Sequence, residues 1–295
     1  MSDQRQGVKE FPSWLKKLWP AQYDSRARQI LESLKTNTVC RSAECPNLGE
    51  CWSHGTAAFL ILGRRCTRSC RFCAVRSGQG ETLESLADEP TRVAHAAKQL
   101  GLKFVVITSV TRDDLPDEGA AHFARVIQSL RETCGSQLLI EALVPDFHAR
   151  EDCLRAVLTA RPDVFNHNIE TIARLYPTVR PQADYTRSLR VLEIAKHLDS
   201  TLRIKSGLMV GLGETQDEAR ACIGDLRRAG CEILTIGQYL QPSKTHLHVR
   251  EFIHPDVFKN YESYAMSLGF CAAACGAFVR SSYQAEQMLR GRIQL

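Results

Sequence analysis

Half of the chain's twelve cysteines stand within residues 40–73, CRSAECPNLGECWSHGTAAFLILGRRCTRSCRFC. They form two groups of three with different spacings. The first group, CxxxxCxxxxxC, consists of Cys40, Cys45 and Cys51. The second group, CxxxCxxC, consists of Cys66, Cys70 and Cys73. Thiolates bind the irons of iron–sulfur clusters, and a 4Fe–4S cubane has four irons to bind. Three cysteines leave one iron open, so each group predicts a cluster that can take a further ligand.

Two other uses of clustered cysteines fit less well. The segment MSDQRQGVKEFPSWLKKL is polar and contains acidic residues, unlike a signal or transit peptide. We therefore expect a cytoplasmic protein in a reducing compartment, where disulfides are rare. A structural zinc site takes four ligands, usually at paired short spacings. His54 lies between the two groups and could be a fourth ligand, so zinc stays an open alternative.

Arginines crowd around the second group of cysteines, although the net charge of the chain is only +5. They are Arg64, Arg65, Arg68, Arg71 and Arg76. They could offset thiolate charge or face an anionic ligand or an acidic partner, and simple solvation is an equally weighted alternative. No aromatic-interleaved motif supports a nucleic-acid partner. The longest apolar run near the cysteines, AAFLIL, is too short to cross a membrane. We therefore expect neither a nucleic acid nor a membrane as a partner.

The rest of the chain alternates between strand-like and helix-like patterns. Apolar or β-branched runs predict strands over residues 57–63, 103–109, 137–144, 163–170, 202–211 and 232–240. Helical patterns lie between them, and several end in glycine. Such repeats imply parallel strands with right-handed crossovers. We therefore predict an α/β fold, a partial (β/α)6 TIM-type barrel with N- and C-terminal extensions.

This fold would place the second group of cysteines where barrel enzymes have their active sites, because CxxxCxxC directly follows the first predicted strand. The predicted division of the chain has three segments. Residues 1–57 are an N-terminal extension with the first cysteine group, 58–242 form the barrel, and 243–295 are a C-terminal extension that carries RSSY. Short helices are expected around residues 25–35 and 261–268. We expect both extensions to close on one catalytic core.

The motif CTRSCRFC resembles the cluster motif of the radical S-adenosylmethionine (SAM) superfamily, including the aromatic Phe72 before the third cysteine. The resemblance implies that Cys66, Cys70 and Cys73 hold a 4Fe–4S cluster whose open iron binds the amino and carboxylate groups of SAM. One electron from that cluster would cleave SAM to a 5′-deoxyadenosyl radical. Ser109, at the end of the second predicted strand, occupies the position at which the superfamily binds the SAM amino group.

Other polar residues carry weaker signals. Asn168 and Glu170, in NHNIET, could face SAM, and a satisfied pair of strand-end side chains is the alternative. GLMVGLGET lacks the strand–turn–helix pattern of a dinucleotide site, which excludes NAD. The remaining cysteines are predicted to be small buried hydrophobes: Cys134, Cys153, Cys222, Cys231, Cys271 and Cys275. Four histidines without metal spacing are predicted to be surface or packing residues: His95, His122, His246 and His248.

Nearly the whole chain resembles the lipoyl synthase family. The resemblance rests on CRSAECPNLGECW, GTAAFLILGRRCTRSCRFCAV, VITSVTRDDLPDEGAAHFA, FNHNIETIARLYPTVRP, KSGLMVGLGET, LTIGQYLQPSKTHL and VRSSY. It implies that Cys40, Cys45 and Cys51 hold an auxiliary 4Fe–4S cluster. The fourth iron would be bound by Ser281 of RSSY, with Arg280 beside it. GAFVRSSY, HLHV and RPQADY replace the more usual GPLVRSSY, HLPV and RPGADY, and none of these changes removes a cluster ligand.

The implied reaction inserts two sulfur atoms, at carbons 6 and 8, into an octanoyl chain amide-linked to a lysine of a carrier protein. Each product would consume two SAM molecules, and the auxiliary cluster would be the sulfur donor. The implied carriers are lipoyl-carrier domains of 2-oxoacid dehydrogenase complexes or the glycine cleavage H protein. Further implied partners are a ferredoxin- or flavodoxin-type electron donor and an iron–sulfur carrier that rebuilds the cluster.

Two other classes of protein stay open at this stage. A radical SAM methylthiotransferase acting on RNA also pairs two clusters. It would be expected to carry an RNA-binding module, and nothing after residue 242 resembles one. A non-catalytic iron–sulfur electron carrier would explain the cysteines but neither the six β–α units nor the open site on each cluster.

Overall fold

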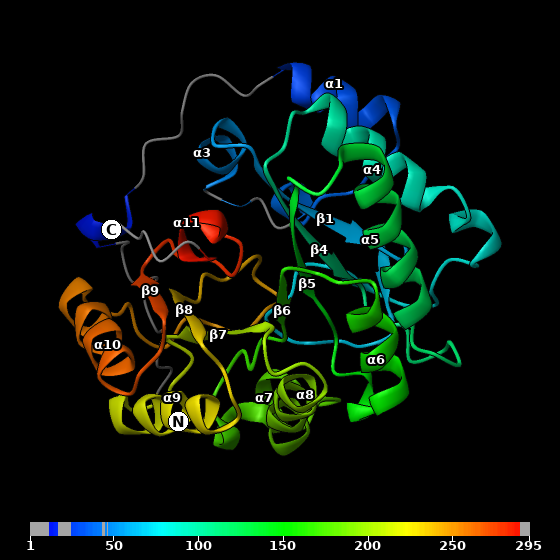
Figure 1. Cartoon of the computed structure of the whole chain (residues 1–295). Helices are drawn as coiled ribbons and strands as arrows, with labels where there is room; N and C mark the ends of the chain where they lie inside the picture. Colours follow the sequence, from blue (N-terminus) through cyan, green and yellow to red (C-terminus); the bar gives the residue numbers. More distant parts are fainter. Residues whose placement is uncertain (1–11, 17–24, 43–44, 46, 290–295) are drawn as a thin grey trace.

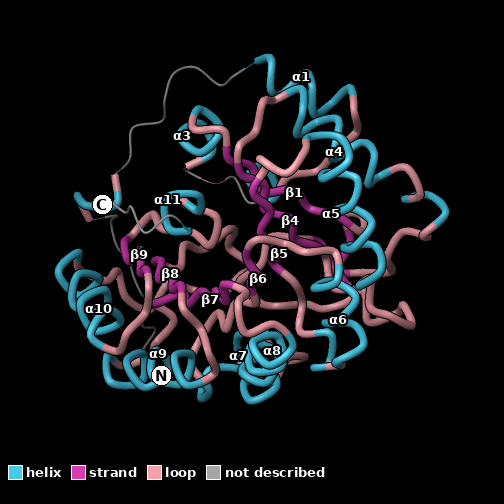
Figure 2. The backbone as a smooth tube through the Cα atoms, viewed as in Figure 1, coloured by secondary structure: helices cyan, strands magenta, loops and turns pink. Residues whose placement is uncertain are grey.

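The computed structural model describes residues 12–16, 25–42, 45 and 47–289 (Figure 1). Its main sheet is parallel, with the strand order β1-β4-β5-β6-β7-β8-β9. The strands are β1 (Thr56–Ile61), β4 (Phe104–Ser109), β5 (Leu139–Leu143), β6 (Val164–Asn166), β7 (Arg203–Val210), β8 (Ile233–Gln238) and β9 (Ala272–Gly276). They follow one another in a curved arc, and β1 does not pair with β9, so the sheet is a partial barrel (Figure 2).

Helices connect consecutive strands and cover the convex side of the arc (Figure 1). They are α4 (Glu89–Gln99), α5 (Ala120–Cys134), α6 (Glu151–Thr159), α8 (Tyr185–Leu198), α9 (Gln216–Arg228) and α10 (Pro255–Ser267). Shorter helices are α1 (Ser25–Ser33), α2 (Val39–Ser42), α3 (Leu48–Ser53), α7 (Tyr176–Val179) and α11 (Ala285–Leu289). The 3-10 turns are η1 (Ser13–Leu15), η2 (Glu84–Leu86), η3 (Phe147–Ala149) and η4 (Ala173–Leu175). A separate small sheet pairs β2 (Arg65–Cys66) with β3 (Arg76–Ser77).

The two faces of the sheet pack against different partners. Strand β1 is buried at every position, as expected where both faces of a parallel sheet are covered. Phe59 belongs to the large core beneath the strand-connecting helices. Ala58 and Phe104 belong instead to a second cluster, which contains Leu48 of α3 and Ala285 of α11. The N- and C-terminal segments therefore close the concave side of the arc, where α3 and α11 lie in Figure 1.

The predicted α/β class and all six predicted strands are confirmed, but the sheet has a seventh strand that the sequence analysis missed. Strand β9 reads AAACG, without a β-branched or aromatic residue, so its local pattern does not predict a strand. This segment forms a strand because it pairs in parallel with the edge of β8. The pairing runs from Ala272 beside Ile233 to Gly276 beside Gly237. The three-segment division stays a prediction, with the C-terminal segment supplying this strand.

The structure also places the cysteines outside the two groups, and His122. The prediction of buried cysteines is wrong for Cys271, which is exposed because it stands just before edge strand β9. Cys134 is only partly buried, and the buried ones are Cys153, Cys222, Cys231 and Cys275. The buried His122 packs in the core, where its Nε2 lies 2.7 Å from Glu89 Oε2.

No helix within the described residues is long and apolar enough to cross a membrane.

Candidate active site

The second group of cysteines lies in the loop that follows β1, beside the C-terminal end of β4. The Sγ of Cys66 accepts hydrogen bonds from the backbone N–H groups of Arg68 at 3.4 Å and Thr111 at 3.3 Å. Both N–H groups can also donate to a sulfur that binds iron. The loop therefore fixes the position of the Cys66 sulfur, and its role as an iron ligand stays a prediction.

The other two thiols of this loop lie close together in a desolvated position. Burial raises the pKa of Cys73 to about 12, and the neighbouring Cys70, Cys66 and Glu170 add to the rise. Burial also raises the pKa of Cys70, against the effect of the nearby Arg180 guanidinium. Because metal-ligating thiols must lose their protons, a cation has to replace them here. Iron would supply that charge, so these residues fit a 4Fe–4S cluster.

A buried ion-pair network anchors the same loop to the barrel. Arg68 forms bidentate hydrogen bonds with Asp146 at 2.8 and 2.9 Å and with Asp113 at 2.8 Å. Arg187 adds a second cation, with its Nε 2.9 Å from Asp146 Oδ2. Burial disfavours the Asp146 carboxylate, but the Arg68 guanidinium holds its pKa well below its usual range. The solvated alternative for the arginine cluster is thus wrong for Arg68, because a paired buried guanidinium positions the loop.

Three candidate SAM-contacting residues lie at strand ends on this edge. The hydroxyl of Ser109 is buried and has no hydrogen-bond partner among the described residues, which suits an incoming polar group. Asn168 Nδ2 donates to Glu170 Oε1 at 3.1 Å. Burial raises the pKa of Glu170, although Arg180 opposes the shift. Phe72 packs with the apolar cluster around Tyr239. These positions are consistent with SAM binding, and their roles stay predictions.

Glu170 also adopts a backbone conformation that is unusual for a side-chain-bearing residue. Its φ angle is 64°, in the left-handed region, which costs free energy unless the surroundings hold it. Here the Glu170 N–H donates to Gly207 O at 2.9 Å, and its carbonyl accepts from Met209 N at 2.9 Å. Such strain is concentrated at functional sites, and the Glu170 carboxylate lies close enough to the second group of cysteines to raise the pKa of Cys73.

The first group of cysteines packs on the concave face of the sheet. Cys40 is buried in the cluster that contains Ala58 and Phe104. Burial raises the pKa of its thiol to about 11, and the nearby Cys45 adds to the rise. The indole of Trp52 lies against the Cys40 thiol and opposes this rise in its pKa. A buried thiol with a second thiol and an N–H donor beside it fits a metal centre that carries acceptor sulfides.

The C-terminal tail covers this first group. Asn47 Nδ2 donates to the carbonyl of Phe278 at 2.6 Å, and Tyr283 Oη donates to Glu50 Oε1 at 2.9 Å. Burial lowers the pKa of Arg280, and the neighbouring Cys45 thiol opposes the shift. RSSY therefore lies against the CxxxxCxxxxxC segment although more than two hundred residues separate them.

Ser281 itself points into a polar interior formed by strand residues that the sequence analysis missed. Asn166 Nδ2 donates to Ser281 Oγ at 2.8 Å and to Glu141 Oε1 at 2.7 Å. Lys205 Nζ pairs with Glu141 Oε2 at 2.8 Å, with both side chains buried. Ser281 Oγ donates in turn to Asn168 Oδ1 at 3.2 Å. The signal was present in the sequence as polar residues inside the apolar strand runs QLLIEALV and LRIKSGL.

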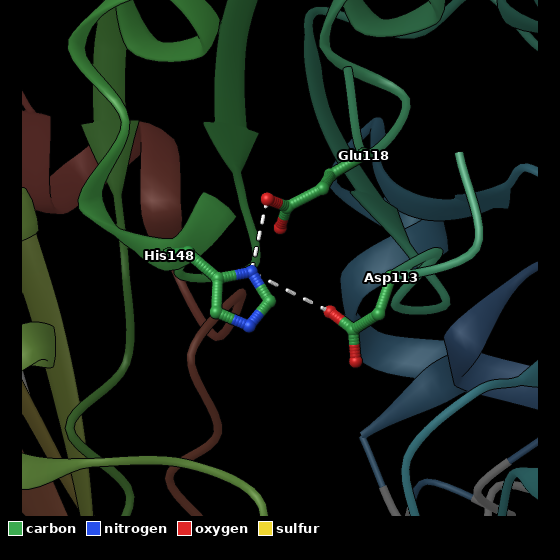
Figure 3. A group of neighbouring side chains, drawn as sticks. All are labelled: Asp113, Glu118 and His148. Carbon is green, nitrogen blue, oxygen red and sulfur yellow. Dashed lines mark ion pairs between the residues drawn. The ribbon is translucent and has the colours of Figure 1, made fainter. Parts of the chain in front are cut away.

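The side chains of Asp113, Glu118 and His148 form a further polar cluster near the loop that carries the second group of cysteines. His148 Nδ1 lies 2.9 Å from Glu118 Oε1 and 3.9 Å from Asp113 Oδ1, with both carboxylates directed at the ring (Figure 3). This set resembles a metal-binding group. However, Arg68 already binds both oxygens of Asp113, so we interpret the set as an ion-pair network that joins the loops after β4 and β5.

Comparisons with known proteins agree with this geometry. The family model of the radical SAM superfamily matches residues 60–226. The lipoyl synthase of Caldanaerobacter subterraneus subsp. tengcongensis is 51% identical over 275 residues, which cover 93% of this chain and 95% of the relative. That of Chlorobium limicola is 51% identical over 285 residues, with 95% and 96% covered. This chain belongs to the lipoyl synthase family. The predicted resemblance is confirmed, and membership of the superfamily implies a 4Fe–4S cluster and SAM.

Solved structures of lower identity support the fold alone. Methylornithine synthase matches with a TM-score of 0.51 and 16% identity, over 78% of this chain and 67% of that chain. Coproporphyrinogen III oxidase from Escherichia coli, a radical SAM enzyme, matches with a TM-score of 0.55 and 13% identity, over 73% of this chain and 53% of that chain. The fold of this chain is therefore shared with these two enzymes, one of which is a radical SAM enzyme.

Proposed function

We propose that this chain inserts two sulfur atoms, at carbons 6 and 8, into an octanoyl group amide-linked to a lysine of a carrier domain. It would use Cys66, Cys70 and Cys73 for the SAM-binding cluster. The first group of cysteines, with Ser281, would hold an auxiliary 4Fe–4S cluster that is a substrate, because its sulfides end in the product. Each lipoyl group would then consume two SAM molecules.

One observation carries this proposal: the side chain of Asn168 connects the two predicted cluster sites. It donates to Glu170, which is close enough to the second group to raise the pKa of Cys73. It also accepts from Ser281, in the tail that covers the first group. Two sites that open on one interior suit a reaction in which a carbon radical must meet sulfur before water quenches it.

The chain's own residues would prepare the site for that chemistry. When bound, the cluster and SAM supply a primary carbon radical that can abstract hydrogen from an unactivated C–H bond. Ser109 and Glu170 would orient SAM, and Arg180 would balance the charge of the Cys70 thiolate. Ser281 would be an oxygen ligand that leaves iron more readily than a thiolate does, so the auxiliary cluster can be dismantled.

The test is an anaerobic assay of the reconstituted protein with SAM, a reductant and an octanoyl-lysine peptide. We expect the lipoyl peptide by mass spectrometry and two 5′-deoxyadenosines per lipoyl group. Cleavage of SAM without sulfur insertion would contradict the proposal. An octanoylated carrier domain, an electron donor of ferredoxin or flavodoxin type and an iron–sulfur carrier are the predicted partners, and the cytoplasm is the predicted location.

A further inference from the structure

A cavity of about 840 Å³ lies beside both cysteine groups without including any of their thiols. Its lining contains Arg41, which follows Cys40, and Arg65, which precedes Cys66. Ala74, which follows Cys73, also lines it. The segments that carry the two predicted clusters are therefore two walls of one cavity.

Positive charge predominates in this cavity. Its cationic lining residues are Lys35, Arg41, Arg64, Arg65 and Arg76. Its two carboxylates already have partners. Glu32 pairs with Arg28 and Arg41, and Glu81 accepts from the backbone N–H of Arg64 at 3.2 Å. The cavity thus offers an excess of cations to a ligand.

Four of these cations form no ion pair with any described residue: Lys35, Arg64, Arg65 and Arg76. Arg65 and Arg76 also occupy paired positions of the small parallel sheet β2–β3, so two like charges stand side by side. Such a pair destabilises a sheet unless a negative charge lies close by. No structural purpose within the described residues accounts for it, which points to an anionic ligand from outside.

The exposure of these side chains indicates the size of that ligand. Lys35, Arg64, Arg65 and Arg76 are all exposed and are spread over several segments. A small anion is usually bound by buried donors that converge on one point. Exposed cations around an open cavity instead match the charged rim of a protein interface, where they steer and orient a partner.

We propose that this basic cavity, defined by Lys35, Arg64, Arg65 and Arg76, docks an acidic face of the protein domain that bears the octanoyl-lysine. This inference rests on the proposed function and names how its macromolecular substrate is recognised. Docking here would place the modified lysine between the two cysteine groups. The charges would accelerate and orient association, while the short octanoyl-lysine arm itself would need none of them.

The experiment measures binding and turnover separately. An octanoylated carrier domain with a negative net charge is titrated into the reconstituted enzyme by calorimetry at about 50 and about 200 mM salt, a range over which charge screening increases. The variants are the double substitution Arg65→Gln/Arg76→Gln and, away from the cysteines, Lys35→Gln. The matched control is Arg155→Gln/Arg190→Gln, which removes two exposed cations from α6 and α8. Steady-state rates are then compared for the domain and for a short uncharged octanoyl-lysine peptide.

We expect Kd and KM for the domain to rise about tenfold in the double variant and about threefold in Lys35→Gln, with a weaker salt dependence. Kd and KM for the domain should be the same in the control variant as in the wild type. KM for the peptide should be the same in Lys35→Gln as in the wild type. Domain binding equal to the control in both cavity variants would overturn the proposal. Cavity-dependent binding of tRNA in place of the domain would also overturn it. Normal domain binding without any lipoyl product would instead reject the proposed function.

Discussion

Ser281 Oγ donates a hydrogen bond to Asn168 Oδ1 at 3.2 Å across 113 residues of sequence. The same Asn168 donates to Glu170, so the tail that covers the first cysteine group touches a strand end that faces the second. Asn166 donates to Ser281 as well and holds the hydroxyl oxygen in place. A change at Ser281 should therefore affect the auxiliary site directly, and the SAM site only through Asn168.

The first prediction concerns Ser281. Ser281→Ala should make the auxiliary cluster labile and lower the lipoyl yield at least tenfold, because one iron loses its ligand. Ser281→Cys should hold the cluster more tightly, since thiolate binds iron well, and should release sulfur more slowly. Mössbauer spectra and product mass report the two effects. Full lipoyl yield from Ser281→Ala with an unchanged cluster spectrum would refute the serine ligand.

The second prediction separates the two cysteine groups with matched substitutions. Cys70→Ala should abolish 5′-deoxyadenosine formation, because the SAM-binding cluster loses a ligand. Cys45→Ala should still cleave SAM but form no lipoyl group, since only the sulfur donor is lost. Each variant should retain roughly one cluster per chain by iron and sulfide analysis. Substantial SAM cleavage by Cys70→Ala would contradict the assignment of the SAM-binding cluster. Thiolated product from Cys45→Ala that lacks the auxiliary cluster would contradict the assignment of the sulfur donor.

The third prediction concerns the ion pairs of Arg68 with Asp113 and Asp146, which anchor the loop that carries the second group of cysteines. Asp146→Asn leaves Arg68 buried with one carboxylate fewer, which should cost about 3 kcal/mol of unfolding free energy. The loop that carries Cys66 and Cys70 then keeps only Asp113 as an anchor for Arg68, so the SAM-binding cluster should also form less completely. Anaerobic denaturant unfolding and iron content measure the two effects. Asp152→Asn, at an exposed ion pair on α6, is the control and should change neither. Equal stability of Asp146→Asn and the wild type would show that the network does not support the loop.

The fourth prediction is a pH dependence from His167. Burial lowers its pKa to about 4, and the neighbouring Arg180 charge contributes, so the ring is neutral in the folded protein at neutral pH. The unfolded chain binds a proton near the ordinary value of about 6.5, so stability must fall as the pH drops through the window between these values. From pH 7 to pH 5, the free energy of unfolding of the wild type should fall by about 2 kcal/mol more than that of His167→Asn.

Denaturant unfolding of both proteins at the two pH values measures this difference, with His95→Asn as an exposed control. Taking the difference between wild type and variant removes the contribution of groups that titrate in both. An identical pH dependence for wild type and His167→Asn would show that the ring is protonated, or accessible to water, in the folded state.

Much of the fold was predictable because it is encoded locally. The six predicted strands are largely apolar and mostly buried, and the helices between them follow a helical period. Strand β9 escaped prediction because its alanines pair only when the edge of β8 is already present. The exposed Cys271 was misjudged for a related reason, since burial depends on which strand forms the edge of the sheet.

The sequence by itself determined which thiols are available as ligands, because each of the two cysteine groups supplies three, and three thiols would leave one iron of a 4Fe–4S cluster open. Only the tertiary structure decided how the tail, the strands and the loop meet. Ser281 lies 115 residues from Asn166, and Arg68 lies 78 residues from Asp146. Such contacts depend on strand order and packing, not on any local pattern, so the polar interior and the basic cavity become visible only when the chain is folded.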